Sequence, residues 1–186
     1  MDKYINQIIN ADCLDILREF PDKSIDLVLT DPPYGIGMAK NTNICSKTDC
    51  YGKNSKGFYA KEIHKQKQWD NERPDKIYFD EIVRVSKNQI IFGGNYFADY
   101  LKPSRGWIFW DKKEHPTQKP LKLFEMILND YSNENDLVLD CFSGSGTTAI
   151  ACHNLKRRFI CIEKDWDYYK ASVERLKDAQ SQLKLF

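Results

Sequence analysis

The sequence predicts an α/β fold in a single domain, built around a largely parallel, doubly wound sheet. Short apolar strands alternate along the chain with amphipathic helical segments, which is the order that produces parallel sheets. Two of these strands run into unusual loops, Asp31–Tyr34 and Phe142–Thr148. The 186 residues suffice for one substantial core and are few for two. We therefore expect one domain that spans residues 1–186.

The first half of the chain is expected to form two strands and two helices. In order, they are a strand at 5–10, a helix from Asp12 to Phe20, a strand at 25–30 and a helix at 74–85. Asp12 precedes the apolar periodicity of its helix, so its carboxylate can cap the first turn. The strand at 25–30 must end near Pro32, because proline cannot donate to a strand ladder.

The second half is expected to add further short apolar strands and three helices. The strands are placed at 89–92, 107–110, 137–141 and 159–162, and the helices start at Pro120, after Thr148 and at Asp165. The helix after Pro120 has apolar residues at helical spacing, and the face that they form is expected to be buried. Its members are Leu121, Phe124, Leu128 and Tyr131.

The two unusual loops are expected to open on the same edge of the sheet. Each loop follows the carboxyl end of a strand, and in doubly wound sheets ligands bind beyond the carboxyl ends of strands. This placement predicts one crevice that holds both the proline-rich loop and the glycine-rich loop.

The glycine loop favours an adenosyl-type cofactor. Gly144 and Gly146 follow a strand and open a helix, where glycine lets the backbone turn sharply and approach a ligand closely. Glu163 ends the next strand, and a carboxylate in that place can accept both hydroxyls of a ribose. The third glycine of the dinucleotide pattern is absent, and no Lys-Ser/Thr pair follows, which argues against a phosphate-gripping loop. Taken alone, these glycines leave a tight turn without a ligand as the less favoured alternative.

The segment Asp31–Tyr34 presents hydrogen-bond acceptors. Its two prolines fix the backbone and remove two amide donors, which leaves the Asp31 carboxylate and the Pro32 carbonyl. Two acceptors can hold both hydrogens of an exocyclic amine and return electron density to its nitrogen. Tyr34 offers a flat face on which a base extruded from a duplex can stack. In isolation, the alternative is a rigid turn between a strand and a loop.

Several segments of the sequence resemble the DNA N6-adenine and N4-cytosine methyltransferases. They are Asn10–Cys13, Asp31–Tyr34, Ile91–Asn95, Trp110–Lys112, His115–Pro120 and the pattern Asp140-x-Phe142-x-Gly144-x-Gly146-Thr147. Their order, with the Asp-Pro-Pro-Tyr tetrad ahead of the glycine loop, is similar to that of the permuted subgroup of the family. The likeness runs through nearly the whole chain.

The resemblance implies a Rossmann-like, S-adenosylmethionine-dependent methyltransferase fold with an antiparallel edge strand. It implies methylation of DNA, at adenine N6 more often than at cytosine N4, because the tetrad begins with Asp. The catalytic residues that it implies are Asp31, Pro32, Pro33 and Tyr34. The implied cofactor-binding residues are Asp12, Asp31, Lys119, Asp140, Phe142, Gly144, Gly146, Thr147 and Glu163. No metal is expected.

One part of the chain is shorter than the resemblance implies. Relatives carry several dozen residues between the Trp-Asp-Lys and His-Pro-Thr-Gln-Lys-Pro segments, and that region usually includes target-recognition elements. Here only Lys113 and Glu114 intervene. We expect that the recognition region is missing between 113 and 115. A shortened, catalytically impaired remnant, or a subunit that needs a partner, is therefore an alternative to an active enzyme.

The charge distribution favours double-stranded DNA as a partner. The formal net charge is only +1, but residues 38–68 hold seven lysines against Asp49 and Glu62. The same segment contains Tyr51 and Phe58, and a positive loop with aromatic residues suits a nucleic-acid backbone. Its composition also suits a solvated, flexible loop, and the two interpretations are compatible.

The remaining composition is that of a soluble, cytoplasmic protein. No stretch is apolar and long enough for a membrane span, and the first residues lack the apolar run of a secretion signal. The cysteines form no C-x-x-C pair, which favours reduced thiols, while a metal or disulfide role for Cys45 and Cys50 stays open. A homodimer, and a companion restriction enzyme or recognition subunit, are compatible with the sequence.

Two other enzyme classes fit the sequence less well. Methyltransferases that act on RNA or on protein glutamine often begin the tetrad with Asn and place the cofactor loop first, and neither feature holds here. A nicotinamide oxidoreductase would leave Asp31–Tyr34 without an explanation.

Overall fold

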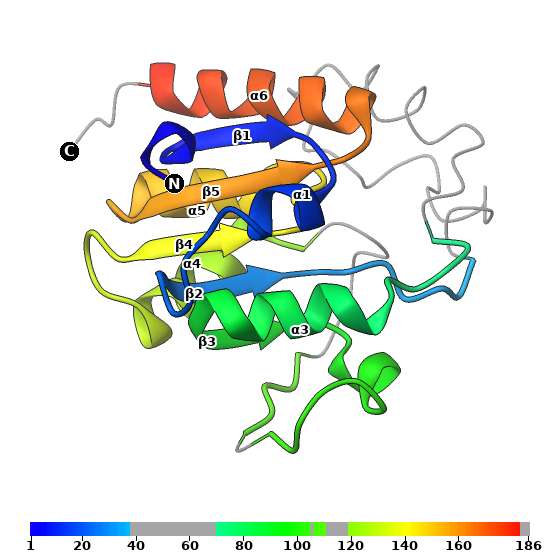
Figure 1. Ribbon diagram of the computed structural model, residues 1–186. Coiled ribbons are helices and arrows are strands. Elements are labelled where there is room, and N and C mark those ends of the chain that lie inside the picture. Colours follow the sequence, from blue (N-terminus) through cyan, green and yellow to red (C-terminus); the bar gives the residue numbers. More distant parts are fainter. Residues whose placement is uncertain (38–69, 105, 111–118, 183–186) are drawn as a thin grey trace.

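The computed structural model describes residues 1–37, 70–104, 106–110 and 119–182 (Figure 1). Its elements, in chain order, are η1 (Asp2–Tyr4), β1 (Gln7–Asn10), α1 (Cys13–Leu17), β2 (Ile25–Thr30), α3 (Lys76–Val85), β3 (Ser86–Ile91), η4 (Gly94–Phe97), α4 (Leu121–Tyr131), β4 (Leu137–Asp140), α5 (Thr147–Asn154), β5 (Arg158–Glu163) and α6 (Trp166–Ser181). The α/β alternation that the sequence predicts is confirmed.

The strands form one sheet in the order β1-β5-β4-β2-β3, and every pairing in it is parallel. In Figure 1 the arrows of β1, β5, β4 and β2 point the same way, so their carboxyl ends share the edge on the right. The strand β4 lies at the centre, and all four of its residues are buried. The antiparallel edge strand that the family resemblance implies is not found among the described residues.

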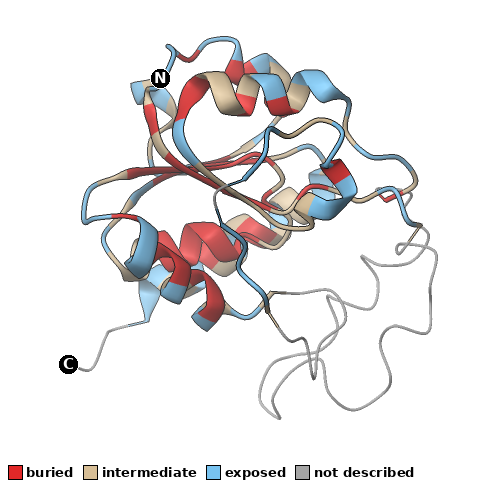
Figure 2. Cartoon of the chain, turned by 90° about the horizontal axis from the view of Figure 1, so that it is seen from below, coloured by how far each residue is buried: buried red, intermediate tan, exposed pale blue. Residues whose placement is uncertain are grey.

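Helices cover both faces of the sheet. On one face, α1 and α3 pack on β2, β4 and β5 through Leu17, Ile82 and Val85. On the other face, α4, α5 and α6 surround a second cluster that includes Phe124 and Leu176. Figure 2 shows buried residues concentrated on the strands and on the helix surfaces that face them. This two-faced burial explains why the strands read as continuous apolar runs.

Local sequence signals place the helix ends. The Asp12 side chain accepts a hydrogen bond from the backbone N–H of Leu14, as its predicted role as an N-cap requires. The Asp165 side chain caps α6 in the same manner. In α4, Phe124 and Leu128 are buried as expected, whereas Tyr131 is 53% exposed because the helix ends there, beyond the edge of its packing partners.

The strand predicted at 107–110 is wrong. This segment has no ladder partner among the described residues, and Trp107 and Phe109 are 72% and 93% exposed. A strand needs a hydrogen-bonded neighbour, so an apolar run without one remains irregular. In the part of the chain that the structure describes, no helix is both long and apolar enough to cross a membrane.

Candidate active site

The two unusual loops follow the strands between which the direction of crossover changes. The chain leaves β2 toward β3 on one side and leaves β4 toward β5 on the other, so β2 and β4 flank the topological switch point. Ligands of doubly wound sheets bind at this point. The Thr30 hydroxyl at the end of β2 donates to Asp140 Oδ1 at the end of β4, at 2.8 Å. The prediction that the two unusual loops share one edge of the sheet is therefore confirmed.

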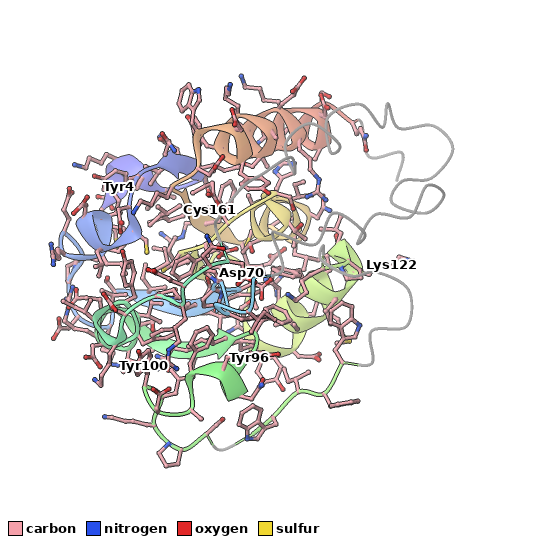
Figure 3. The ribbon with its side chains drawn as sticks, turned by 90° about the vertical axis from the view of Figure 1, so that its right-hand side faces the viewer. Tyr4, Asp70, Tyr96, Tyr100, Lys122 and Cys161 are labelled. Carbon is pink, nitrogen blue, oxygen red and sulfur yellow. The ribbon has the colours of Figure 1, made fainter. Side chains whose placement is uncertain are left out.

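The loop Asp31–Tyr34 is wrapped around a buried carboxylate, Asp70, that no motif in the sequence indicates. Asp70 is 1% exposed, and its Oδ1 accepts from the backbone N–H groups of Tyr34 at 2.7 Å and Gly35 at 2.9 Å. The Asp70 carbonyl accepts from the N–H of Gly37 at 2.8 Å. Figure 3 looks onto the carboxyl edge of the sheet and shows Asp70 near its middle. Asp70 thus fixes the direction in which the tetrad presents its side chains.

Both carboxylate oxygens of Asp31 have partners within the chain. The Tyr34 hydroxyl donates to Oδ1 at 2.5 Å, and the Lys119 ammonium forms an ion pair with Oδ2. The Lys119 side chain is only 12% exposed and lies 4.7 Å from the centre of the Phe92 ring. Burial and the neighbouring Asp31 carboxylate raise the pKa of the Tyr34 hydroxyl, so this group remains a proton donor in the hydrogen bond.

The Tyr34 ring is packed against Tyr96 and Gly93. It stacks on Tyr96 with a centroid distance of 4.8 Å and an interplanar angle of 13°. Gly93 lies against the ring, and a Cβ atom added there would come within 2.2 Å of Tyr34 Cε1. Gly93 also has a φ of +65°, a conformation that glycine adopts without strain. Any larger residue at Gly93 would therefore displace the Tyr34 ring.

The Pro32 carbonyl is available as an acceptor. Within the described residues, no backbone or side-chain donor reaches it. Pro32 itself is buried at the start of the loop. Both acceptors that the sequence predicts for an amine therefore lie at the switch point, one of them open and one bound by side chains of the same chain.

A small cavity lies on the other side of the switch point. Its volume is about 70 Å³, and the residues that line it come from the ends of β1, β4 and β5 and from α3. They are Ala11, Asp12, Cys13, Tyr78, Cys141, Phe142, Glu163 and Lys164. Three of the predicted cofactor residues, Asp12, Phe142 and Glu163, are in this set. Aromatic rings with carboxylates beside them are suited to an adenosyl group.

Asp12 is the polar centre of this cavity. Its carboxylate accepts from the Tyr78 hydroxyl at 3.1 Å and pairs with Lys164 at 2.9 Å. Burial alone would raise the pKa of Asp12, but Lys164, the N–H of Leu14 and Tyr78 together lower it. Burial, together with the hydrogen bond to Asp12, raises the pKa of Tyr78 to about 12. Asp12 is therefore ionised and Tyr78 is a donor at neutral pH.

Glu163 connects the cavity to the glycine loop. Its Oε2 accepts from the N–H of Gly144 at 2.7 Å, and its Oε1 accepts from the N–H of Asp165 at 2.8 Å. Each carboxylate oxygen can accept two hydrogen bonds, so both keep a lone pair for a ligand hydroxyl. Burial raises the pKa of Glu163.

The two glycines of the loop have different surroundings. Gly144 has a φ of +50°, and nothing lies within 4 Å of the place where a Cβ would stand. Gly146 has a φ of +74°, and a Cβ there would be 2.9 Å from Ser172 Cβ in α6. Gly144 thus borders open space that suits an approaching ligand, whereas Gly146 permits close packing between α5 and α6.

Asp140 faces inward and organises the loop. It is 3% exposed and accepts from Thr30, from Thr148 and from the N–H of Phe142. Burial raises the pKa of Asp140 to about 6. Asp140 is not among the residues that line the small cavity, so its side chain supports the loop from behind.

Thr147 and a second residue without a sequence signal, Arg175, hold the start of α5. Arg175 Nη1 donates to the Ser145 carbonyl at 2.9 Å and lies 3.0 Å from Thr147 Oγ1. Thr147 is 5% exposed. The contact reaches over 28 residues of sequence, so only the packing of α6 on α5 brings the two together.

Several predicted features lie outside the described residues. They are the basic segment 38–68, Asp111 and Lys112, the segment 115–118, and Cys45 and Cys50. Among the described residues, no group of three or more His, Cys, Asp or Glu side chains could hold a metal ion.

A family model described as DNA methylase, for the N6 and N4 methyltransferases, matches residues 43–174. This match covers more than half of the chain. The chain belongs to this family. The protein is an S-adenosylmethionine-dependent DNA methyltransferase of the N6-adenine or N4-cytosine type.

Individual relatives support the same assignment of this DNA methyltransferase. The type II methyltransferase M2.MboI of Moraxella bovis is 26% identical, with 98% of this chain and 91% of the relative covered. The type II methyltransferase M.HpaI of Haemophilus parainfluenzae is 25% identical, with coverage of 91% and 74%. The crystal structure of the M1.HpyAVI–SAM complex has the same fold, with a TM-score of 0.53, 21% identity and coverage of 91% and 98%.

The alignment to M2.MboI extends over 253 positions, whereas this methyltransferase has 186 residues. At least 67 aligned positions, the difference between the two lengths, therefore have no residue in this chain. The relative is longer within the matched region, because 98% of this chain is already included in the match.

Proposed function

We propose that the protein methylates the exocyclic N6 of an adenine that is flipped out of double-stranded DNA. The observation that carries this proposal is the position of Asp31 and the Pro32 carbonyl at the switch point, next to the glycine loop. A flipped base is needed, because the amine of a stacked base is out of reach.

Asp31 and Pro32 would hold the amine. The Pro32 carbonyl accepts one N–H, and Asp31 accepts the other and takes the proton that the nitrogen loses on methylation. Asp31 also binds Tyr34 and Lys119 in the structure, so one of these two partners gives way to the amine. Pro33 keeps the loop rigid, and Asp70 keeps it oriented.

Residues of the small cavity and the glycine loop would hold the cofactor. S-adenosylmethionine supplies an activated methyl group, so the protein mainly has to position the amine. Glu163 offers lone pairs to the ribose hydroxyls, and Asp12 and Phe142 border the adenine side. Gly144 offers open space beside its backbone, while Asp140, Gly146 and Thr147 keep the loop in shape. Lys119 offers a cation to the cofactor carboxylate.

Adenine is favoured over cytosine by the Asp that begins the tetrad, and N4-cytosine methylation is the alternative on the same site. A second candidate is a shortened remnant that binds cofactor or DNA without transfer. It is favoured by the two residues that separate Lys112 from His115 and by the greater length of M2.MboI. The membership in the permuted subgroup, a homodimer, a companion restriction enzyme or recognition subunit, and a cytoplasmic location stay predictions from the sequence.

One assay distinguishes these candidates. The protein is incubated with radiolabelled S-adenosylmethionine and unmethylated duplex DNA, and the DNA is digested to nucleosides. Label in N6-methyladenosine supports the proposal, and label in N4-methylcytosine corrects the base. Cofactor binding without any transfer to DNA supports the remnant.

The variant Asp31→Ala tests the role of the carboxylate. We expect it to abolish transfer while largely preserving S-adenosylhomocysteine binding, because the small cavity does not include Asp31. The control Asp130→Ala removes an exposed carboxylate near the far end of α4 and should leave transfer unchanged. Turnover of Asp31→Ala at the wild-type rate would refute the assigned role.

A further inference from the structure

The face of Tyr34 on which a base is expected to stack is already covered. Tyr96 lies parallel to it at 4.8 Å, the spacing of a stacked aromatic pair. Gly93 also lies against the Tyr34 ring, which leaves the ring little room to shift. The Tyr34 hydroxyl is bound to Asp31, which holds the ring in its plane.

The backbone that carries Tyr96 is firmly held, but its side chain is not. Tyr96 belongs to η4, whose Phe97 is fully buried against Phe79. The Tyr96 carbonyl accepts from Arg73 at 3.0 Å, and Arg73 forms a bidentate pair with Asp99. The Tyr96 side chain, by contrast, sits at the surface and is 40% exposed. Rotation of this one side chain can therefore uncover Tyr34 without moving η4.

Only one side of Tyr96 allows the amine to reach Asp31. A base in direct contact with Tyr34 lies next to the carboxylate, because Asp31 is hydrogen-bonded to the hydroxyl of that ring. A base on the outer face of Tyr96 would be a further ring layer away, beyond hydrogen-bond reach of Asp31. The productive position of the base is thus the position that Tyr96 occupies in the structure.

We infer that Tyr96 fills the target-base position in the DNA-free protein and must swing aside when the base enters. This inference rests on the proposed function, since it concerns the base that the enzyme would methylate. Tyr96 is then a positioning residue that also affects specificity. An incoming base must replace one aromatic stack by another, and a purine, with its larger surface, does so more readily than a pyrimidine.

The test uses 2-aminopurine nucleoside as a probe, because its fluorescence is quenched when it stacks on an aromatic ring. The variants are Tyr96→Ala, which removes the competing ring, and Tyr96→Phe, which keeps it. The control is Tyr131→Ala, which removes a 53% exposed tyrosine from the end of α4. Far-UV circular dichroism verifies that each variant is folded.

We expect Tyr96→Ala to bind the probe about three- to ten-fold more tightly than the wild type, the value of one aromatic stack. Tyr96→Phe and Tyr131→Ala should match the wild type. Introducing Tyr34→Ala into the Tyr96→Ala protein should abolish the gain, since the uncovered surface is then lost.

Equal or weaker binding by Tyr96→Ala would overturn the inference, because Tyr96 would then support the base or take no part. Absence of quenching in both the wild type and Tyr96→Ala would overturn it as well. Failure of the proposed function looks different: the wild type would bind the probe, and Tyr96→Ala would bind it more tightly, yet no label would enter N6-methyladenosine.

Discussion

At the scale of single residues, the groups expected to handle the substrate already have partners within the chain. Asp31 is bound by Tyr34 and Lys119, and Tyr34 is covered by Tyr96. These contacts keep a carboxylate and an aromatic ring in place without a ligand. They also mean that binding of cofactor and base must exchange internal contacts for external ones, so each exchange can be measured by mutation.

Lys119 provides the first such exchange. If its ammonium turns from Asp31 to the cofactor carboxylate, Lys119→Gln should weaken S-adenosylhomocysteine binding by about ten-fold or more, the loss of a charge-assisted hydrogen bond. Binding of 5′-methylthioadenosine, which lacks the carboxylate, should not change. Isothermal titration calorimetry measures both.

Lys122→Gln is the matched control, because Lys122 is exposed in the first turn of α4 (Figure 3). It should leave both affinities unchanged. If Lys119→Gln weakened both ligands equally, Lys119 would act on the structure of the site and not on the carboxylate.

The buried Asp140 carboxyl should make the stability of the protein depend on pH in an unusual direction. Its pKa is raised from 3.8 to about 6. Between pH 4 and 6 the native state therefore keeps a proton on Asp140 that the unfolded state has lost. The contribution of Asp140 to stability therefore falls as pH rises from about 4 to 6, by about 3 kcal/mol at 1.36 kcal/mol per pKa unit.

Urea unfolding of the wild type and of Asp140→Asn at pH 4 and pH 7 measures this effect. The other carboxyl groups are common to both proteins and cancel in the difference between their unfolding free energies. We expect that difference to move by about 3 kcal/mol in favour of Asp140→Asn at the higher pH. A difference that does not vary with pH would contradict the buried, titrating carboxyl.

Residues of the site differ in how far the sequence reveals them. The tetrad and the glycine loop are contiguous, so their chemistry is visible in a few adjacent letters. Asp70, Tyr96 and Arg175 are not, because they meet their partners at separations of 36, 62 and 28 residues. Nothing in their local sequence distinguishes them from other polar or aromatic residues, and only the fold brings them to the site.

At the scale of elements, the junction of α5 and α6 depends on Gly146. Alanine at Gly144 or at Gly146 must adopt a left-handed conformation, which costs about 1–2 kcal/mol at either position. At Gly146 the added methyl group also meets Ser172, and such overpacking costs about 1–3 kcal/mol more. Gly146→Ala should therefore destabilise the protein clearly more than Gly144→Ala.

Urea denaturation of the two variants gives their free energies of unfolding. The pair is matched, since both glycines lie in one loop and both have positive φ. Equal losses of stability would show that the contact with Ser172 carries no weight. Among folded molecules, we expect Gly144→Ala to weaken cofactor binding more than Gly146→Ala, because the open space lies beside Gly144.

Most elements could be predicted from their hydrophobic period and their end signals. The strand β2 has the predicted bounds, and β4 and β5 differ from prediction by a residue or two, because an apolar run defines a buried strand well. The segment 107–110 shows the limit of this reasoning. Its apolar residues are typical of a strand, but a strand also needs a neighbouring strand with which to form hydrogen bonds. No such neighbour is present among the described residues.

At the scale of the whole molecule, the sheet order turns two distant motifs into one site. The parallel order places β2 beside β4, although 106 residues lie between Thr30, where β2 ends, and Leu137, where β4 begins. The contact between Thr30 and Asp140 spans 110 residues. The sequence could predict the shared edge from parallel connectivity alone. It could not predict that the two loops are immediate neighbours, because strand order depends on how the helices pack.

The position of the site on one edge also determines where DNA must approach, and this gives the last prediction. The proposed base position lies at the carboxyl edge of the sheet, and the chain enters the basic segment 38–68 directly after the tetrad at that edge. If lysines of this segment contact phosphates, each one should add about 0.9 to the steepness with which log K falls against log salt concentration. Replacing Lys53, Lys56 and Lys61 by glutamine should therefore flatten the slope for duplex DNA by up to about 2.7.

Fluorescence anisotropy of a labelled duplex at several salt concentrations measures this slope. Lys156→Gln is the control, because Lys156 is 78% exposed and precedes β5 at the opposite edge of the sheet. An unchanged slope in the triple variant would move the DNA-binding surface away from the basic segment, since counterion release reports phosphate contacts directly.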